Sequence, residues 1–306
     1  MKHPSAFAKT QPDKIAYRMA GSGETLSFGA LDQKANQGAH GFRSLGVGQG
    51  DTVALLFENR LDFITLCWAA QRSGVFYTAI SHHLQPAEIA YIINDCGGKV
   101  AILSDTYADI LPQLRDSCPD ARFFVSGGEV EDDLDWQKLQ SSMPVTPISD
   151  PAAGMDQLYS SGTTGKPKGI LRRFEVQPVE TVIPPLMTVM CEQMAGMDDS
   201  SIYLSPAPLY HAAPLRTSMM AVMLGGTSII MEKFDAETFL SLVQEHAVTH
   251  TQLVPTMFVR MLKLPEDIKA KYDISSVEFC ISTGSPWPHE VKMAMIDWWG
   301  PVFWET

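Results

Sequence analysis

The residues with the clearest chemical potential lie in one short segment, residues 159–169, which reads Tyr-Ser-Ser-Gly-Thr-Thr-Gly-Lys-Pro-Lys-Gly. It packs three glycines, four Ser or Thr hydroxyls and two lysines into eleven positions. Glycines let a backbone approach a ligand closely. Backbone N–H groups, hydroxyls and ammonium charges in one loop can all be aimed at one anion. This inventory predicts a loop that binds a polyphosphate.

The order of these residues differs from that of the Walker phosphate loop. The Walker pattern needs Gly-x-x-x-x-Gly-Lys followed by Ser or Thr at the start of a helix. Here Pro167 follows Gly165 and Lys166, and Gly162 stands too close to that pair. Residues 169–171 are typical of the start of a strand, so we expect a strand–loop–strand cradle. Composition alone also fits a flexible surface loop, but the order of the residues argues against it.

The segment resembles the phosphate-binding signature of the adenylate-forming (AMP-binding) superfamily, which includes acyl-CoA synthetases, luciferases and the adenylation domains of peptide synthetases. Further similarity is spread along the chain from about residue 4 to residue 306. It lies in residues 25–28, 45–55, 58–59, 206–211, 224–226, 254–256 and 284–286. The chain is therefore similar to the amino-terminal large domain of these enzymes, in the style of the fatty-acyl and aryl CoA ligases.

The resemblance implies an ATP-dependent carboxylic acid–CoA ligase that works in two steps. A carboxylate attacks the α-phosphate of ATP, pyrophosphate leaves, and CoA then captures the acyl-adenylate. The implied cofactors are ATP, Mg²⁺ and CoA as co-substrate, and the partner is a small carboxylic acid that the sequence does not identify. Because the first step joins two anions, positioning and charge neutralisation must supply most of the catalysis.

Two sets of site residues follow from the resemblance. The set expected to bind the phosphates of ATP is Ser161, Gly162, Thr163, Thr164, Gly165, Lys166 and Lys168. The set expected to bind the acid and adenine is His211, Val254, Pro255, Thr256, Thr283, Gly284, Ser285 and Pro286. A lone histidine after an apolar run is more often structural, but the resemblance puts His211 beside the bound carboxylate. We assign it substrate binding or gating and not proton transfer.

Several parts of the family's site are expected beyond Thr306. They are a Tyr-Gly-x-Thr-Glu run, an aspartate for the ribose, and a small carboxy-terminal domain with the lysine that contacts the reacting groups. The resemblance therefore assigns no catalytic lysine and no metal ligand to this chain. We expect a truncated portion of a ligase, with little or no turnover by itself.

Apolar patterns indicate the elements that would position these residues. Short apolar runs typical of buried parallel strands occur at 53–57, 75–80, 100–103, 202–204, 251–254 and 277–281. Helical patterns occur after Ser27, at 61–71, after Pro86, and at 236–245, 255–264 and 288–299. The alternation predicts an α/β protein with two largely parallel sheets flanked by helices. We expect one incomplete AMP-binding large domain, 1–306, with approximate lobes 1–150 and 151–306.

Composition narrows the class of protein. The 306 residues include 23 Lys and Arg and 35 Asp and Glu, a formal net charge of −12, without a basic run, which disfavours nucleic acid as a partner. No apolar stretch approaches the ~18 residues that a transmembrane helix needs. Five scattered cysteines form no Cys-x-x-Cys pair and argue against disulfides or a structural zinc site. We expect a cytoplasmic protein, and whether it forms a homo-oligomer is left open.

Four other functions remain open at this point. One is a non-catalytic module that binds nucleotide or acyl groups. Another is a peptide-synthetase adenylation domain, which would need an acidic anchor for an amino group; Asp235 and Glu232 are not obviously placed for that. A luciferase-like oxidase would be indistinguishable from this half of the chain. A Walker-type kinase or NTPase is weaker still because Pro167 interrupts its motif.

Overall fold

The computed structural model describes residues 2–160, 167–169 and 173–306, which form two compact units. Unit 1 comprises residues 5–13 and 28–183, and unit 2 comprises residues 2–4, 14–27 and 184–306. The units therefore part at 183–184, whereas the sequence pattern suggested a lobe boundary near 150. Residues 153–157 join unit 1 through backbone hydrogen bonds, such as Gly154 N to Gln71 O and Gln157 N to Tyr77 O (2.9 Å).

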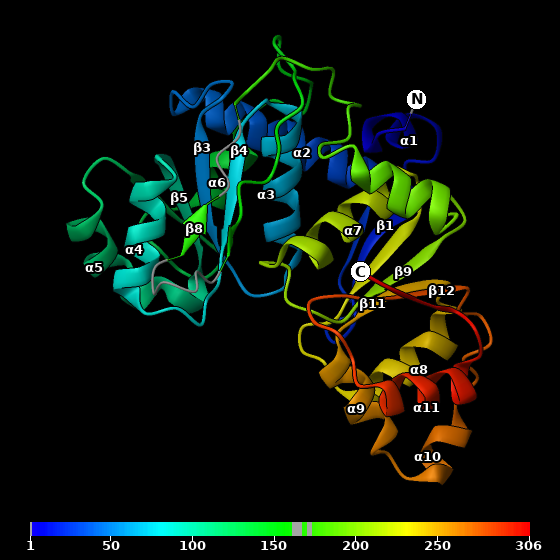
Figure 1. Ribbon diagram of the computed structural model, residues 1–306. Helices are drawn as coiled ribbons and strands as arrows, with labels where there is room; N and C mark the ends of the chain where they lie inside the picture. The colour runs from blue at the N-terminus through cyan, green and yellow to red at the C-terminus, as the bar shows by residue number, and fades with distance from the viewer. Residues whose placement is uncertain (1, 161–166, 170–172) are drawn as a thin grey trace. The chain divides into compact units, whose positions relative to one another are not determined.

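Unit 1 is built on a four-stranded parallel sheet in the order β4-β3-β5-β6 (Figure 1). Its strands are β3 (Thr52–Leu56), β4 (Phe76–Ile80), β5 (Gly98–Ser104) and β6 (Arg122–Ser126). Every residue of β3 and β4 is buried, as expected for parallel strands covered on both faces. A separate antiparallel pair joins β7 (Tyr159–Ser160) to β8 (Lys168–Gly169).

The helices of unit 1 follow from the strand order. They are α2 (Phe28–Ser44), α3 (Leu61–Arg72), α4 (Pro86–Asp95), α5 (Leu111–Ser117) and α6 (Trp136–Ser141), with a 3₁₀ segment η1 (Asp105–Ile110). The chain moves in one direction from β3 to β4 and in the other from β4 through β5 to β6. Right-handed crossovers therefore put α3 on one face and α4 and α5 on the other, as Figure 1 shows.

Unit 2 holds a seven-stranded sheet in the order β13-β12-β11-β9-β10-β1-β2. Its strands are β1 (Ile15–Met19), β2 (Thr25–Ser27), β9 (Ile202–Ser205), β10 (Thr227–Ile230), β11 (His250–Leu253), β12 (Phe279–Ser282) and β13 (Phe303–Glu305). All neighbouring pairs are parallel except β1 and β2. The predicted α/β fold with two largely parallel sheets is thus confirmed.

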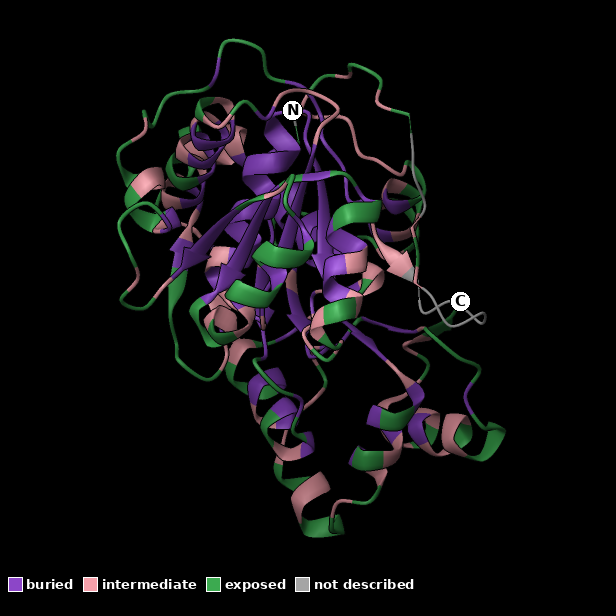
Figure 2. Ribbon diagram, turned by 90° about the vertical axis from the view of Figure 1, so that its left-hand side faces the viewer, coloured by how far each residue is buried: buried purple, intermediate pink, exposed green. Residues whose placement is uncertain are grey.

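The helices of unit 2 pack against both faces of this sheet. They are α7 (Ala212–Met223), α8 (Ala236–His246), α9 (Pro255–Leu262), α10 (Glu266–Lys271) and α11 (His289–Trp299), preceded by a π-helix, η2 (Thr188–Met194). Phe239 of α8 and Phe258 of α9 belong to one fully buried cluster with Leu253 of β11. The short helix α1 (Pro4–Thr10) precedes β1. Figure 2 shows buried residues concentrated on the strands.

The five cysteines are free and buried. Burial disfavours a thiolate in every case. It raises the pKa of Cys96 to about 11 and that of Cys191 to about 12. These thiols therefore stay protonated at neutral pH and act as small core side chains.

Candidate functional site

Three of the segments singled out by sequence follow neighbouring strands of unit 2. Residues 206–211 follow β9, residues 254–256 follow β11, and residues 283–286 follow β12. Thr251 of β11 is paired with Leu204 of β9, and Leu253 with Ser282 of β12, all in parallel register. Because the carboxyl ends of parallel strands meet at one edge, these segments gather at the carboxyl edge of the unit 2 sheet.

His211 lies at the start of α7, where the chain turns from β9 into the helix. Its extended backbone (φ −86°, ψ 147°) makes it the N-cap residue, and its N–H donates to the carbonyl of Pro208 at 3.2 Å. The imidazole is exposed and its ring centroid lies 4.4 Å from that of Tyr210. The side chain is therefore accessible to a ligand.

Residues 254–256 lie at the start of helix α9, and the three differ from one another in their exposure to solvent. Val254 is the N-cap residue and is partly exposed, Pro255 is the first helical residue and is buried, and Thr256 is exposed. Proline suits the first turn of a helix because its missing N–H would have no intrahelical partner there. Pro255 therefore has a structural part in starting α9, while Val254 and Thr256 have exposed surface at this edge.

The turn after β12 adjoins Val254. The Thr283 N–H donates to the carbonyl of Leu253 at 3.1 Å, which ties the turn to β11. Gly284 has φ +89°, a left-handed conformation that other residues adopt at a cost, and a Cβ there would lie 3.6 Å from Val254 Cγ1. Ser285 and Pro286 are exposed. The backbone is thus open to solvent beside the end of β11.

Two polar residues at this edge were missed by the sequence analysis. Gln252 is buried, and its Nε2 donates to Thr283 Oγ1 at 2.7 Å. Its Oε1 and the Oγ of buried Ser282 have no hydrogen-bond partner among the residues that the structure describes. A buried acceptor without a partner carries a free-energy cost that a ligand with N–H or O–H donors can remove. Gln252 shares its strand with His250 and Thr251, so no apolar pattern distinguishes it in the sequence.

The segment predicted to bind phosphate belongs to unit 1. Its flanks form the antiparallel pair β7–β8, in which Tyr159 faces Gly169 and Ser160 faces Lys168. The flanks are therefore strands on both sides, as the sequence predicts. Lys168 is exposed. The other six predicted residues, Ser161, Gly162, Thr163, Thr164, Gly165 and Lys166, lie outside the described residues.

The carboxyl edge of the unit 1 sheet carries a different arrangement, centred on Arg60. The guanidinium forms ion pairs with Asp105 (2.7 Å), Asp62 (3.3 Å) and Glu58 (3.4 Å), which follow the ends of β3 and β5. Ser104 Oγ donates to Glu58 Oε1 at 2.9 Å, and Ser126 Oγ donates to Asp62 Oδ2 at 3.0 Å. The hydrogen bond from Arg60 lowers the pKa of Asp105. This cluster of one arginine and three carboxylates is named the Arg60 network below.

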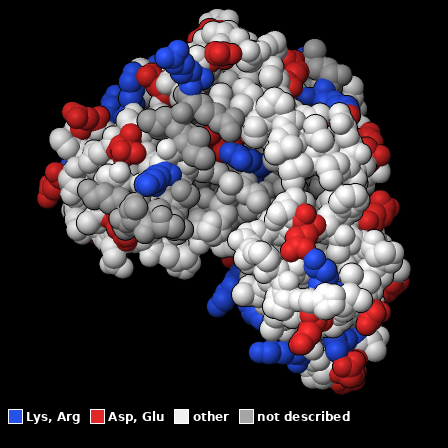
Figure 3. Space-filling model, viewed as in Figure 1, with Lys and Arg blue, Asp and Glu red and all other residues white. Residues whose placement is uncertain are grey.

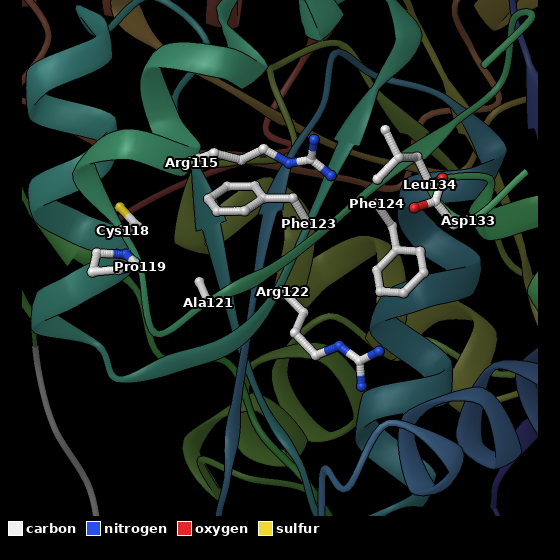
Figure 4. Close-up of a pocket in the computed structure, with 9 residues that line it drawn as sticks. All are labelled: Arg115, Cys118, Pro119, Ala121, Arg122, Phe123, Phe124, Asp133 and Leu134. Carbon is white, nitrogen blue, oxygen red and sulfur yellow. The ribbon is translucent and has the colours of Figure 1, made fainter. Parts of the chain in front are cut away.

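A cavity of about 320 Å³ lies elsewhere in unit 1, around the start of β6 (Figure 4). Its wall includes Arg115, Arg122, Phe123 and Phe124, and none of the residues singled out by sequence. The guanidinium groups of the two arginines lie well apart in Figure 4. They do not form a single anion-binding clamp, so the cavity is not favoured over the edge of unit 2 as the ligand-binding site.

Neither a basic surface in the view of Figure 3 nor a metal-binding cluster marks a second site within the described residues. On the face drawn in Figure 3, the coloured Lys and Arg side chains are dispersed among acidic ones and form no broad basic patch. Within residues 2–160, 167–169 and 173–306, no group of three or more His, Cys, Asp or Glu side chains is arranged to hold a metal ion. None of the helices described there combines the length and the apolar character that crossing a bilayer requires.

The family match and the most similar curated proteins agree with one another. Residues 5–306 match the family described as AMP-binding enzyme. 4-Coumarate–CoA ligase 5 of Oryza sativa subsp. japonica is 29% identical over 282 residues, which cover 89% of this chain and 50% of that protein. Long-chain-fatty-acid–CoA ligase FadD13 of Mycobacterium tuberculosis is 28% identical over 288 residues, covering 92% and 54%. The chain thus spans about half the length of these relatives.

Solved structures agree in fold. The inhibitor-bound N-terminal domain of FACL13 from Mycobacterium tuberculosis superimposes with a TM-score of 0.80 at 26% identity, covering 97% of this chain and 74% of that one. The anthranilate CoA ligase AuaEII, in complex with anthranoyl-AMP, gives a TM-score of 0.82 at 21% identity, covering 99% and 59%. The second likeness is one of fold alone.

Proposed function

This chain belongs to the AMP-binding enzyme family, and from that premise we propose that the protein acts as an ATP-dependent carboxylic acid–CoA ligase. It would form an acyl-adenylate with release of pyrophosphate and then transfer the acyl group to CoA. The observation that carries the proposal is the gathering of His211, Val254 and Thr283–Gly284 at one sheet edge, beside buried acceptors that have no partner in the part of the chain that the structure describes.

In unit 2, the edge residues would bind the acid and the adenine ring. His211 is exposed at the N-cap of α7, so its imidazole can contact a carboxylate, and the N-terminus of a twelve-residue helix favours negative charge. Gly284 presents backbone without a side chain, against which a flat base can lie. Gln252 Oε1 can accept a hydrogen bond from a ligand N–H or O–H group.

In unit 1, the residues that follow β7 would bind the phosphates. Ser161, Gly162, Thr163, Thr164, Gly165 and Lys166 supply hydroxyls, backbone N–H groups and one ammonium group, and Lys168 on β8 supplies a second. These donors would neutralise the pyrophosphate as it leaves, because charge builds on its oxygens when the bond to the α-phosphate breaks. Proton transfer is assigned to none of these residues.

Magnesium would enter as part of the substrate, MgATP, and its charge would offset that of the phosphates. The described residues contain no group of three or more His, Cys, Asp or Glu side chains suited to a metal ion. We therefore derive no step through a metal ion held by these residues. CoA is proposed as the acyl acceptor, since the two relatives described above are named as CoA ligases.

The proposal is tested by ATP–pyrophosphate exchange without CoA, on this chain and on any longer chain that contains it. The acids should include short and long aliphatic acids, ring acids and amino acids. In a longer chain that contains these residues, exchange that depends on particular plain acids is the expected result and would identify the substrate class; this chain by itself should show little or none. Exchange with amino acids alone would favour a peptide-synthetase domain, and tight ATP binding without exchange would favour a non-catalytic module.

A matched pair of lysine variants sharpens this test. Lys166→Ala should lower exchange by about 100-fold or more, the scale seen when one donor to a developing anion is removed. Lys34→Ala removes the same charge from an exposed position on α2 of the same unit and should leave exchange unchanged. Equal rates for the two variants would contradict the assignment of the phosphate segment.

A further inference from the structure

A hydrogen bond joins the end of helix α4 to the strand that leads into the phosphate segment. The hydroxyl of Tyr159, on β7, donates to Asp95 Oδ2 at 2.6 Å. Tyr91, one turn earlier on α4, makes a much longer contact with the other oxygen of the same carboxylate, at 3.5 Å. The Tyr159–Asp95 bond is short and charge-assisted, which makes it the stronger of the two.

Asp95 occupies a position that helix energetics disfavour. It is the last residue of α4, where the partial negative charge of the helix dipole repels a carboxylate. Its side chain is exposed and caps no backbone group in the helix. A residue that breaks a local rule without a local gain is often retained for a function. The hydrogen bond from Tyr159 is the gain that the structure offers here.

Tyr159 also fits closely against the strand that follows the phosphate segment. Gly169 lies opposite it on β8, and a Cβ at that position would come within 2.6 Å of Tyr159 Cζ. Any other residue at 169 would therefore displace the ring. The ring packs in addition against the buried cluster around β5 and α4. One side chain thus contacts both flanks of the phosphate segment and the body of unit 1.

The chain before Tyr159 is already attached to the sheet. The Tyr77 N–H donates to the carbonyl of Met155 at 3.1 Å, and the Gln157 N–H donates to the carbonyl of Tyr77 at 2.9 Å. These backbone bonds align residues 155–157 with the edge strand β4. Tyr159 adds a side-chain attachment two residues further on, at the point where the β7–β8 pair begins.

We propose that Asp95 and Tyr159 are positioning residues for the polyphosphate of ATP. Asp95 holds the Tyr159 hydroxyl, and the Tyr159 ring fixes the β7–β8 pair from which residues 161–167 extend. This inference rests on the proposed function of that segment and adds two residues that do not touch the phosphates. Loss of the hydrogen bond should weaken the use of ATP without altering the use of the acid.

The test compares Tyr159→Phe and Asp95→Asn with Tyr91→Phe in the pyrophosphate-exchange assay. Tyr159→Phe keeps the ring and loses only the hydroxyl, and it should raise KM for ATP about tenfold, with KM for the acid unchanged. Asp95→Asn keeps an acceptor oxygen and should have a smaller effect in the same direction. Tyr91→Phe removes the long contact with Asp95 Oδ1 and should leave KM for ATP as in the wild-type protein.

Three outcomes would contradict the positioning role of Asp95 and Tyr159, and they show whether the proposed function fails with it. A general packing defect would lower the melting temperature and change kcat or both KM values together, which would overturn the positioning role. Wild-type KM for ATP in folded Tyr159→Phe and Asp95→Asn proteins would do the same while leaving the ligase proposal intact. A wild-type protein that neither exchanges pyrophosphate nor binds ATP in calorimetry would overturn both.

Discussion

The carboxyl edges of the two sheets carry polar residues in very different states. In unit 1, Arg60 forms ion pairs with Glu58, Asp62 and Asp105, so each of these carboxylates has a charged partner, although Glu58 Oε2 is buried without a hydrogen bond among the described residues. In unit 2, Gln252 Oε1 and Ser282 Oγ are buried and lack a protein partner among the described residues. Ligands of α/β sheets bind outside the carboxyl ends of strands, so topology alone would allow either edge to serve.

The difference shows how side chains decide between two edges of similar topology. Carboxylates that are already paired with an arginine hold strand ends together and have less to gain from a ligand. An edge with unpartnered buried acceptors and an open glycine backbone has both room and a free-energy gain on binding. Changes in the Arg60 network should therefore alter stability, and changes at the unit 2 edge should alter adenylation kinetics.

Among changes at the unit 2 edge, Gly284→Val should give the largest effect on adenylation. The left-handed φ of +89° costs a β-branched residue about 1–3 kcal/mol, which the turn can relieve only by moving its backbone out of that conformation. That movement would remove the backbone surface expected to meet the adenine. We expect kcat/KM for ATP in pyrophosphate exchange to fall by as much as about 100-fold.

Gly23→Val is the matched control for this variant. Gly23 has φ +73° in the β1–β2 hairpin of the same unit, with nothing within 4 Å of a Cβ. It should show a comparable loss of stability and wild-type exchange kinetics. Similar kinetic losses in both variants would mean that the effect of Gly284→Val is only one of folding.

Arg60→Met should have the largest effect on stability at the unit 1 edge. The substitution removes three ion pairs and leaves Glu58, Asp62 and Asp105 to repel one another. Hydrogen bonds to charged groups contribute about 1.5–3 kcal/mol, and we expect a loss of that size in the free energy of unfolding, measured with urea. Exchange kinetics of the folded variant should match the wild type; a tenfold change in KM for ATP would contradict the comparison.

Unlike Arg60→Met, Gln252→Leu should change the kinetics of exchange more than the stability of the fold. It loses the hydrogen bond to Thr283, worth about 1 kcal/mol, but also removes the unpartnered Oε1, so the two changes nearly offset each other. We expect kcat/KM in exchange to fall about tenfold. Thr251→Val is the control, since Thr251 is on the opposite face of β11 and bonds to Leu204 O at 2.9 Å. It should lower stability and leave kinetics unchanged.

The sequence predicted those helices and strands whose apolar pattern can be recognised within the segment itself. The runs at 53–57, 61–71 and 75–80 correspond to β3, α3 and β4, because buried strands and helices have recognisable apolar patterns. Strand β1 was missed, since Arg18 interrupts its apolar run and its partner β10 lies some 200 residues away. Pairing at such separation leaves no periodic signal in either segment.

The candidate site was predictable only where its residues form a motif. His211 and residues 283–286 were found through resemblance and lie at the edge of one sheet. Gln252 was not found, because its importance comes from burial and from an acceptor without a partner. The Arg60 network was also missed, since ion pairs among side chains that follow different strands depend on the order of those strands in the sheet.

The smallest expected effect concerns the pH dependence of the Arg60 network. The hydrogen bond from Arg60 lowers the pKa of Asp105 in the folded protein, so its ionised form stabilises the fold above the ordinary carboxyl pKa. This contribution should be lost as the pH falls from about 5 through the lowered pKa. Asp105 is 40% exposed, so the contribution should stay under about 1 kcal/mol and shrink at high salt.

Asp105→Asn should therefore melt at a lower temperature than the wild type at pH 7, and the two should converge as the pH approaches 3. Asp109→Asn removes the same charge from an exposed position on the same 3₁₀ segment and should run parallel to the wild type. A gap between Asp105→Asn and wild type that stayed constant with pH would mean that packing, and not the ion pair with Arg60, accounts for the stability of this edge. The two sheets would then differ less in electrostatics than their charges indicate.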